Sequence, residues 1–178
     1  TDTPCCIDSS NPSTIEAALS HLQGKKGAVP MINSISLEKE RYEKLLPLVA
    51  GTDMKVIALC MSDKGMPKTV DDRMVIADKL INGLVQHNVP IDNIYVDPLV
   101  QPISTDTTFG FEFLQAIEKI VTTFKGVHTL CGLSNISYGL PERKFLIQAF
   151  MVMAIAKGLD GAIVNPSDKR MMACIVAA

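Results

Sequence analysis

The sequence predicts an α/β fold, an eight-stranded β/α (TIM-type) barrel. Short apolar runs alternate with amphipathic helical stretches along the 178 residues, which indicates a parallel sheet with helical crossovers. Polar residues directly follow most of the apolar runs, and in a barrel these positions would surround one mouth. A doubly wound sheet should carry a glycine-rich phosphate turn after an early strand, and the sequence has none. These observations favour the barrel.

Six apolar runs have the length and the β-branched content of buried parallel strands. They cover residues 4–8, 29–34, 55–61, 94–98, 127–133 and 161–165.

A helical pattern follows each predicted strand, with apolar residues on one face at spacings of three and four. The fifth helix is expected over about 142–157, before Gly158, and the sixth from near Ser167. The first four are marked by Ile15, Ala18, Leu19 and Leu22; by Tyr42, Leu45, Leu46 and Val49; by Ala77, Leu80, Ile81 and Leu84; and by Leu114, Ile117, Val121 and Phe124.

Six strand-helix units do not close an eight-fold barrel, which typically takes about 250 residues. The chain opens almost directly on a strand and stops at Ala178 inside an apolar, helix-like segment. We therefore expect two strand-helix units to be missing before Thr1 and part of the last helix after Ala178. Residues 1–178 would then form one partial barrel domain, from about strand 3 to helix 8, with no second domain.

Composition argues against two classes of function. With 17 Lys and Arg against 19 Asp and Glu and no basic cluster, the chain lacks the charge pattern of a nucleic-acid binder. The most apolar stretch, 145–156, is interrupted by Gln148 and is shorter than the roughly 20 residues of a membrane-spanning helix. Because no secretory signal pattern appears at Thr1, we expect a cytoplasmic location.

The five cysteines are expected to be reduced. Cys5, Cys6, Cys60 and Cys131 lie in or beside apolar runs, which favours buried thiols. No C-x-x-C pair or Cys/His cluster occurs, so we expect no directly bound metal. The three histidines have no partner nearby in the sequence, which favours packing or surface roles.

Four polar residues that end or follow different strands would line the mouth of the barrel: Asp8, Asn33, Asp97 and Asn135. Two carboxylates and two amides, without a nucleophile-base pair, suit a flat heterocycle with several N–H donors and ring acceptors, such as a pterin. The alternative is that Asp8 and Asn33 only cap the helices that follow them. That alternative explains single residues more readily than all four together.

Five segments occur in the order and spacing of a known family. They are CIDSSNPSTIEAAL, PMINSIS, YVDPLVQP, CGLSNISYG and GLDGAIVN. They resemble the methyltetrahydrofolate:corrinoid methyltransferases, including the pterin-binding domain of cobalamin-dependent methionine synthase. The resemblance covers essentially the whole chain. It implies the eight-fold barrel, a start at its third strand, and a homodimer.

The resemblance also implies roles for five residues. Asp8 in CIDSSN, Asn33 in MINSIS and Asp97 in YVDPL match positions that hold the pterin ring. Asn135 in GLSNIS matches an asparagine that approaches the methyl-bearing nitrogen, and Arg143 matches an arginine that contacts the substrate.

The implied reaction moves the methyl group of methyltetrahydrofolate to the cobalt(I) of a corrinoid (cobalamin) carried by a partner protein. An amine leaves only if positive charge develops on its nitrogen, so Asn135 would donate a hydrogen bond there in the transition state. Asp97 would hold a water or a ring N–H in a proton-bearing network. Tyr138 stands where one subgroup of the family has a glutamine, so contacts on that side of the pocket are expected to differ.

Two other functions stay open. A dihydropteroate synthase-like enzyme would need basic residues for a pyrophosphate leaving group, and Lys169 and Arg170 follow the last strand, although CGLSNISYG favours methyl transfer. A pterin-binding module without turnover is the non-enzymatic alternative.

Three further segments are expected to have ordinary structural roles. Residues 62–73 favour a surface loop over a contact with the corrinoid protein, and Met151 and Met153 favour packing on the barrel over a dimer interface. LQGKKG, residues 22–27, lacks the spacing of a phosphate loop and is expected to be a surface turn.

Overall fold

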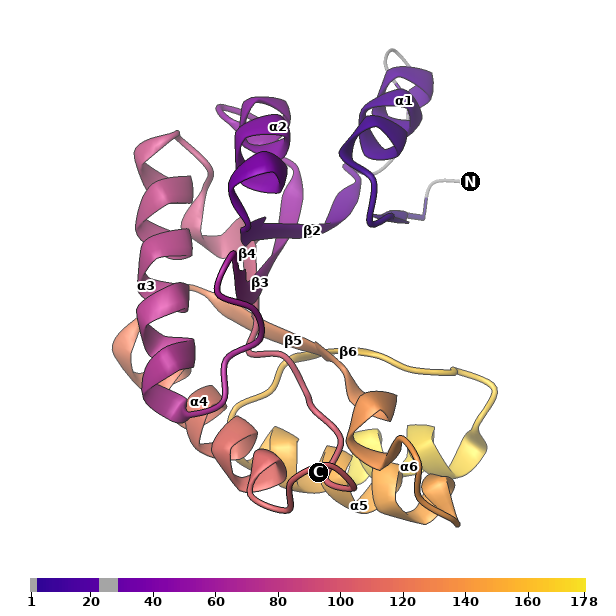
Figure 1. The fold of residues 1–178 in the computed structure, drawn as a ribbon. Helices are drawn as coiled ribbons and strands as arrows, with labels where there is room; N and C mark the ends of the chain where they lie inside the picture. The colour runs from indigo at the N-terminus through magenta and orange to yellow at the C-terminus, as the bar shows by residue number, and fades with distance from the viewer. Residues whose placement is uncertain (1–2, 23–28) are drawn as a thin grey trace.

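A computed structural model describes residues 3–22 and 29–178, which form one curved sheet of six strands with helices along its outer side (Figure 1). The strands lie in chain order and every neighbouring pair is parallel. The α/β barrel-like architecture expected from the sequence is confirmed as a half-barrel. The strands are β1 (Cys6–Asp8), β2 (Met31–Leu37), β3 (Lys55–Ser62), β4 (Ile94–Asp97), β5 (His128–Gly132) and β6 (Gly161–Ile163).

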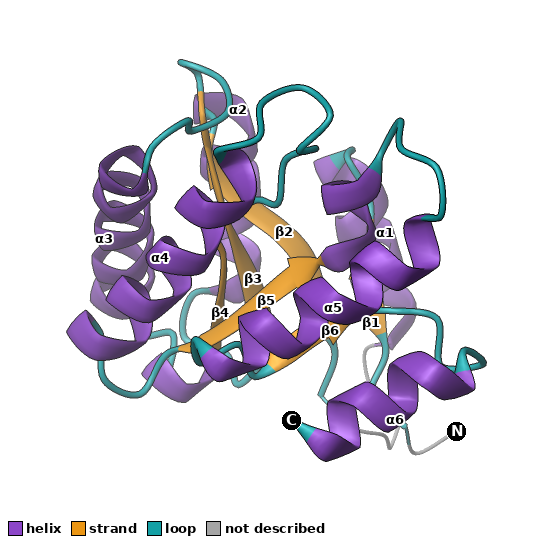
Figure 2. Cartoon of the chain, turned by 90° about the horizontal axis from the view of Figure 1, so that it is seen from below, coloured by secondary structure: helices purple, strands orange, loops and turns teal. Residues whose placement is uncertain are grey.

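A helix follows each strand, as expected, and crosses back over the outer face of the sheet (Figures 1 and 2). The sequence did not predict two short 3-10 helices, η1 (Ile91–Asn93) and η2 (Leu133–Ser137). The α-helices are α1 (Pro12–Leu22), α2 (Lys39–Val49), α3 (Val70–Gln86), α4 (Phe109–Thr123), α5 (Arg143–Ala156) and α6 (Lys169–Ala177).

Strand β2 runs three residues past its expected end at Ser34, to Leu37. The extension is possible because Ser36, although fully buried, donates a hydrogen bond of 2.9 Å to the carboxylate of Glu38. The turn expected over 22–27 lies outside the described residues except for Leu22, which ends α1.

The core lies between the sheet and its helices and has two parts. Ile32, Val56 and Leu80, all fully buried, belong to the part under α1, α2 and α3. Phe113 and Phe150 belong to the part under α4 and α5, where their rings pack 5.7 Å apart. Burying an aliphatic or aromatic side chain of this size contributes about 1.5–3 kcal/mol to the free energy of folding, so the two parts of the core hold the strands in place.

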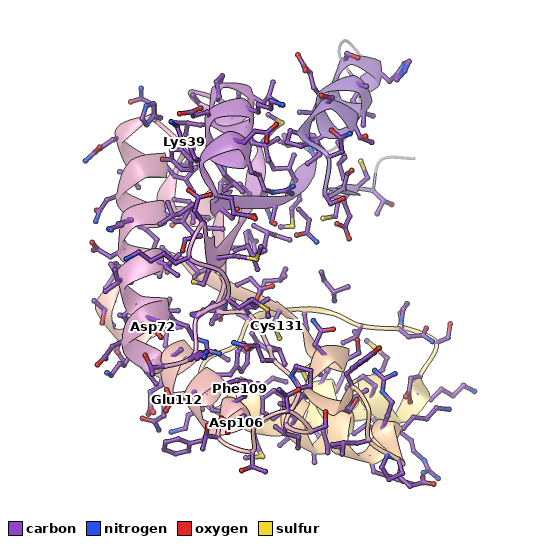
Figure 3. All side chains as sticks on the ribbon, in the orientation of Figure 1. Lys39, Asp72, Asp106, Phe109, Glu112 and Cys131 are labelled. Atoms are coloured by element: carbon purple, nitrogen blue, oxygen red, sulfur yellow. The ribbon has the colours of Figure 1, made fainter. Side chains whose placement is uncertain are left out.

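The start of α3 is fixed by its neighbours in the chain and in space. Thr69 and Asp72 form a capping box, in which each side chain accepts a hydrogen bond from the other residue's backbone N–H. Glu112 of α4 accepts a hydrogen bond of 2.5 Å from the backbone N–H of Val70, and Figure 3 shows Asp72 and Glu112 at adjacent ends of the two helices. The expected loop 62–73 is therefore too long, because residues 70–73 form the first turn of α3 and Arg73 is completely buried.

The cysteine prediction is half correct. Cys60 and Cys131 are buried, and burial raises the pKa of both thiols (Cys131 is marked in Figure 3). Cys5 and Cys6 are exposed, contrary to expectation. The reason is that β1 is an edge strand that pairs only with β2 in the described chain, so nothing covers the inner face of Cys6.

The histidine with the closest contacts, His128, lies at the start of β5, at the edge of the sheet opposite the mouth. Its ring stacks on Tyr95 with centroids 4.6 Å apart, and its Nδ1 lies 2.5 Å from the Asp160 carboxylate. Asp160 is 32 residues away, so its pairing with His128 was not visible in the sequence. These contacts are those of a packed residue.

Met151 is 1% exposed and packs in the core, whereas Met153 is 51% exposed. The packing expected of both is therefore confirmed only for Met151. No helix within the ranges 3–22 and 29–178 combines the length and the apolarity needed to cross a bilayer.

Candidate functional site

The predicted site residues all lie on the mouth side of the sheet. Asp8 and Asp97 end β1 and β4, and Asn33 lies within β2. Asn135 lies in η2 directly after β5, and Arg143 begins α5. Because all the strands are parallel, their carboxyl ends meet along one edge, as the sequence predicted.

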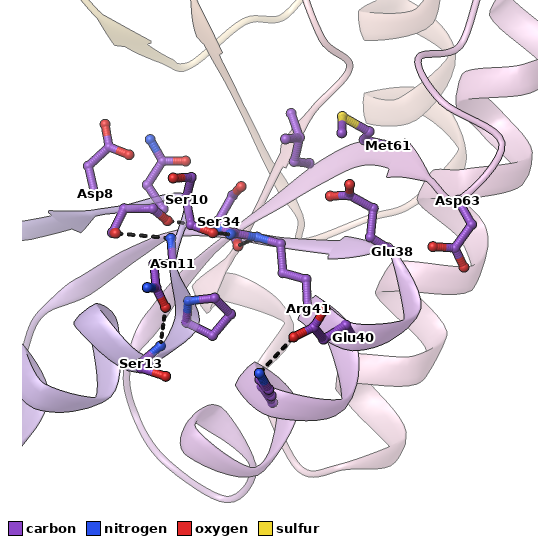
Figure 4. Close-up of a pocket in the computed structure, with 15 residues that line it drawn as sticks. Asp8, Ser10, Asn11, Ser13, Ser34, Glu38, Glu40, Arg41, Met61 and Asp63 are labelled. Carbon is purple, nitrogen blue, oxygen red and sulfur yellow. Dashed lines mark hydrogen bonds and ion pairs between the residues drawn. The ribbon is translucent and has the colours of Figure 1, made fainter.

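Two of these residues, Asp8 and Asn33, line a cavity of about 960 Å3 at the carboxyl ends of β1, β2 and β3 (Figure 4). They are direct partners in the register of β1 and β2. Leu59 and Met61 contribute apolar surface from β3. The remaining lining is mostly polar: Ser9, Ser10, Asn11, Pro12, Ser13, Ser34, Glu38, Glu40, Arg41, Lys44 and Asp63.

The charge of this cavity is predominantly acidic. The carboxylates of Asp8, Glu38, Glu40 and Asp63 line it, against the two cations Arg41 and Lys44. Such a lining favours a ligand that donates hydrogen bonds or carries positive charge, and disfavours a phosphate.

Asp97 does not line this cavity, although its register partner Leu59 does. Its side chain is 9% exposed, and its Oδ1 accepts a hydrogen bond of 2.8 Å from the backbone N–H of Leu99. Burial raises the pKa of Asp97 to about 7, and the Leu99 N–H and the nearby Arg73 charge only partly oppose this effect. Asp97 can therefore take up or release a proton near neutral pH.

Asn135 and Arg143 form the other side of the mouth, beyond β5. The Asn135 residue is exposed, and a Cβ at Gly132 would lie 3.7 Å from its amide nitrogen. Arg143 donates hydrogen bonds to the Ser137 hydroxyl at 3.0 Å and to the Ser134 carbonyl at 3.1 Å. Arg143 therefore fixes the segment on both sides of Asn135.

The capping alternative does not hold for Asp8 and Asn33. The side chain of Asn11 caps α1 by accepting a hydrogen bond of 3.0 Å from the Ser13 N–H. The next helix, α2, begins at Lys39 and is too far along the chain for Asn33 to cap it. The side chains of Asp8 and Asn33 therefore do not cap the helices that follow them.

The sequence analysis missed Arg41, which joins the loop after β1 to strand β2 (Figure 4). Its guanidinium donates to the carbonyl oxygens of Ser34 at 2.6 Å, Ser10 at 2.5 Å and Ser9 at 2.9 Å. A signal was present, since Arg41 precedes the buried Leu45 by four residues and so lies on the inner face of α2.

The sequence analysis also missed Arg73. Like Arg41, it donates hydrogen bonds to backbone carbonyl oxygens, but from α3 of the next strand-helix unit. It is completely buried and donates to the carbonyl oxygens of Lys68 and Thr69 at the start of α3. It also donates to Pro98 and Leu99 after β4. The available signal was its spacing with the apolar face of α3: Ala77, Leu80 and Leu84.

Known proteins resemble this chain in sequence. The family model described as "Pterin binding enzyme" matches residues 1–165. The methylcorrinoid:tetrahydrofolate methyltransferase of Eubacterium limosum is 34% identical over 178 residues, which cover 99% of this chain and 64% of that protein. Methionine synthase of Mycobacterium tuberculosis is 32% identical over 176 residues, covering 92% of this chain and 14% of the relative. The chain thus spans less than two thirds of the length of either relative.

Solved structures are similar in fold. The dihydropteroate synthase of Coxiella burnetii, solved with pteroic acid, superposes with a TM-score of 0.74 at 17% identity, covering 98% of this chain and 65% of that chain. The dihydropteroate synthase of Thermus thermophilus gives a TM-score of 0.73 at 18% identity, covering 98% and 70%. Identities this low speak to the fold alone. With a family model matched over 165 of its 178 residues, the chain belongs to the family of pterin binding enzymes.

Proposed function

We propose that this chain binds a reduced folate by its pterin ring at the carboxyl edge of the sheet and transfers a methyl group between that folate and a corrinoid protein. The observation that carries the proposal is the acidic, amide-bearing cavity around Asp8 and Asn33. A pterin presents several N–H donors and ring acceptors along one edge, and these carboxylates and amides complement them. The printed names of the two sequence relatives agree with this chemistry.

In this proposal Asp8, Asn33 and Asp97 hold the ring. Asp8 and Asn33 are register partners and reach the cavity from neighbouring strands. Asp97 lies two strands further along, and its covered position is consistent with contact to one buried ring edge. A ligand that covered these polar groups and left them unpaired would be rejected, because each polar group removed from water without a partner costs about 1–3 kcal/mol.

Asn135 assists the reaction at the methyl-bearing nitrogen by donating a hydrogen bond as positive charge develops there. The segment that carries the exposed Asn135 is held on both sides of this residue, through the bonds that Arg143 makes to Ser134 and Ser137. Asp97 supports the same step, since a carboxyl whose pKa is about 7 is suited to proton transfer at neutral pH. Arg143 contacts the substrate, and the exposed Tyr138 ring alters the neighbouring side of the pocket.

The direction of transfer is a separate question. The name of the Eubacterium limosum relative describes transfer from a methylcorrinoid to tetrahydrofolate, whereas the family resemblance implies the opposite sense. A catalyst lowers the same barrier for both directions, so Asn135 serves either one. We propose methyltetrahydrofolate as the donor and a reduced corrinoid, which supplies the nucleophile, as the acceptor.

Two assemblies belong to the proposal. The corrinoid arrives on a partner protein that docks over the mouth, and no metal is bound directly by the chain.

A homodimer would cover exposed apolar residues such as Phe111 and Met153, which are 64% and 51% exposed and line an apolar cavity of about 320 Å3 between α4 and α5. The six described strand-helix units would be units three to eight of a closed barrel.

The alternatives are less well supported. The dihydropteroate synthases match in fold but at 17–19% identity, and the acidic cavity disfavours a pyrophosphate there. A pterin-binding module without turnover would bind methyltetrahydrofolate and fail to exchange a methyl group with any corrinoid.

Calorimetric titration with methyltetrahydrofolate tests the proposal, on the 178-residue chain and on a version extended at its N-terminus. Asn33→Ala/Asp97→Ala should abolish saturable binding. Asn82→Ala/Asp78→Ala is the matched control, because it removes the same residue types from the exposed face of α3, where their side chains bond each other at 3.0 Å. A folded, extended chain that shows no binding would remove the functional proposal.

A further inference from the structure

A second cavity at the mouth, of about 720 Å3, lies between the starts of α5 and α6 and has a different character. Four cationic side chains line it against two carboxylates, Glu142 and Asp168, whereas the cavity around Asp8 and Asn33 is acidic. The remaining lining residues are Phe145, Gln148, Asn165 and Ser167. The cations are Arg143, Lys144, Lys169 and Arg170.

One of the two carboxylates is already engaged. Asp168 caps α6 by accepting hydrogen bonds of 3.1 Å from the N–H groups of Arg170 and Met171, and its oxygens lie 3.4 and 3.5 Å from the Gln148 amide nitrogen. These donors lower the pKa of Asp168. The exposed side chains of Lys144, Lys169 and Arg170 therefore give this cavity an excess of positive charge.

The start of α5 adds to this charge. The helix has 14 residues, and no side chain caps its first turn at Glu142. Free N–H groups at such a helix start carry partial positive charge and favour a carboxylate or another anion. Phe145 is 57% exposed and offers an aromatic face in the same cavity.

Arg143 links the basic cavity to the segment that carries Asn135. Arg143 lines the basic cavity and also donates to Ser134 and Ser137, on either side of Asn135. In a reduced folate, the p-aminobenzoyl-glutamate tail leaves the ring at the carbon next to the methyl-bearing nitrogen. With the methyl-bearing nitrogen at Asn135, the tail would begin beside the segment that Arg143 binds.

We propose that the basic cavity binds the anionic tail of the folate, with Phe145 against the aryl ring and Lys144, Lys169 and Arg170 around the carboxylates, so that the chain selects folates with several γ-linked glutamates. This inference rests on the proposed pterin site. The opposite charges of the two cavities match a substrate with a donor-rich ring at one end and a polyanionic tail at the other.

The test compares the dissociation constants of the monoglutamate and triglutamate forms of methyltetrahydrofolate. The protein is whichever form, 178 residues or N-terminally extended, binds the monoglutamate. The triglutamate should bind about tenfold tighter, since each exposed ion pair contributes modestly, and this preference should shrink toward one at about 0.5 M salt. Lys169→Ala/Arg170→Ala should remove most of the preference.

Lys79→Ala/Lys125→Ala is the matched control, because it removes two lysines that do not line the basic cavity, and it should keep the preference. Equal affinities for both forms in the unmutated protein would overturn the tail site and leave the pterin site intact. If neither the 178-residue chain nor the extended chain binds the monoglutamate, the pterin site fails together with the tail site. Inorganic pyrophosphate is the second probe: saturable binding that the Lys169/Arg170 variant loses, without a triglutamate preference, would identify a pyrophosphate site and overturn the proposal.

Discussion

The Nε of Arg73 donates a hydrogen bond of 2.8 Å to the carbonyl oxygen of Pro98, and so a completely buried arginine of α3 fixes the residue that follows Asp97. The same guanidinium reaches Leu99, whose backbone has a φ of 65° and whose N–H donates to Asp97. A non-glycine residue in the left-handed region is strained and persists only where its surroundings hold it. Arg73 therefore positions Asp97 through the turn that both residues share.

Replacement of Arg73 by Met should destabilise the chain by roughly 3–5 kcal/mol, because it leaves several buried carbonyl oxygens without donors. Urea unfolding measures this change. Lys79→Met, on the exposed side of the same helix, should stay within about 0.5 kcal/mol of the parent. A loss for Arg73→Met no larger than that of the control would show that Arg73 does not support the turn.

Asp97 should make stability depend on pH. Its pKa rises from the ordinary value of 3.8 to about 7 on folding, so between these values the folded chain binds a proton that the unfolded chain has released. The contribution of Asp97 to the free energy of unfolding is therefore fully present at low pH. It falls by at most about 4 kcal/mol as pH rises toward 7. Asp97→Asn should remove this slope in urea unfolding between about pH 4 and about pH 8. Parallel profiles for the two proteins would contradict the assignment.

Asn135→Ala should lower the rate of methyl transfer by about two orders of magnitude, the usual effect of losing one donor to developing charge. Single-turnover kinetics with a reduced corrinoid measure the rate directly. Stability should hardly change, since Asn135 is exposed. Near-normal turnover would exclude the proposed role, and Asn82→Ala on α3 serves as the control.

The reactivity of Cys6 tests whether further strands complete the barrel. In the described chain Cys6 is exposed on the inner face of the edge strand β1, whereas Cys60 is fully buried. An extension at the N-terminus that adds strands beside β1 should slow the labelling of Cys6 by a thiol reagent, while Cys60 stays unreactive in both forms. Mass spectrometry resolves the sites. Equal labelling of Cys6 in the two forms would count against added strands.

Much of the fold was readable from local patterns. Apolar runs and helical spacing are local patterns, set by residues that are close in the sequence. They located all six strands and all six α-helices of the described chain to within a few residues. Some boundaries shifted by a few residues, as in β2, where a bond from Ser36 to Glu38 allows a polar residue inside the strand.

The candidate site could be predicted only in part from the sequence. That Asp8 and Asn33 lie side by side follows from parallel strands in chain order, which the alternation already implied. That Asp97 is buried, with its pKa raised by that burial, does not follow from the sequence, because its environment comes from Leu99 and Arg73. Arg73 had a sequence signal in its spacing, but the Pro98 and Leu99 carbonyl oxygens that accept its hydrogen bonds lie on another segment.

The sequence by itself determined the order of the elements and the edge at which the polar residues gather, because both depend on periodicity and on strand direction. Only the tertiary structure decided which of those residues share a cavity, which are buried, and that a basic cavity lies beside α5 and an acidic one beside α2. Burial, hydrogen bonding and local charge depend on groups that are distant in the sequence. Arg41 illustrates this, since it contacts Ser9 from 32 positions away.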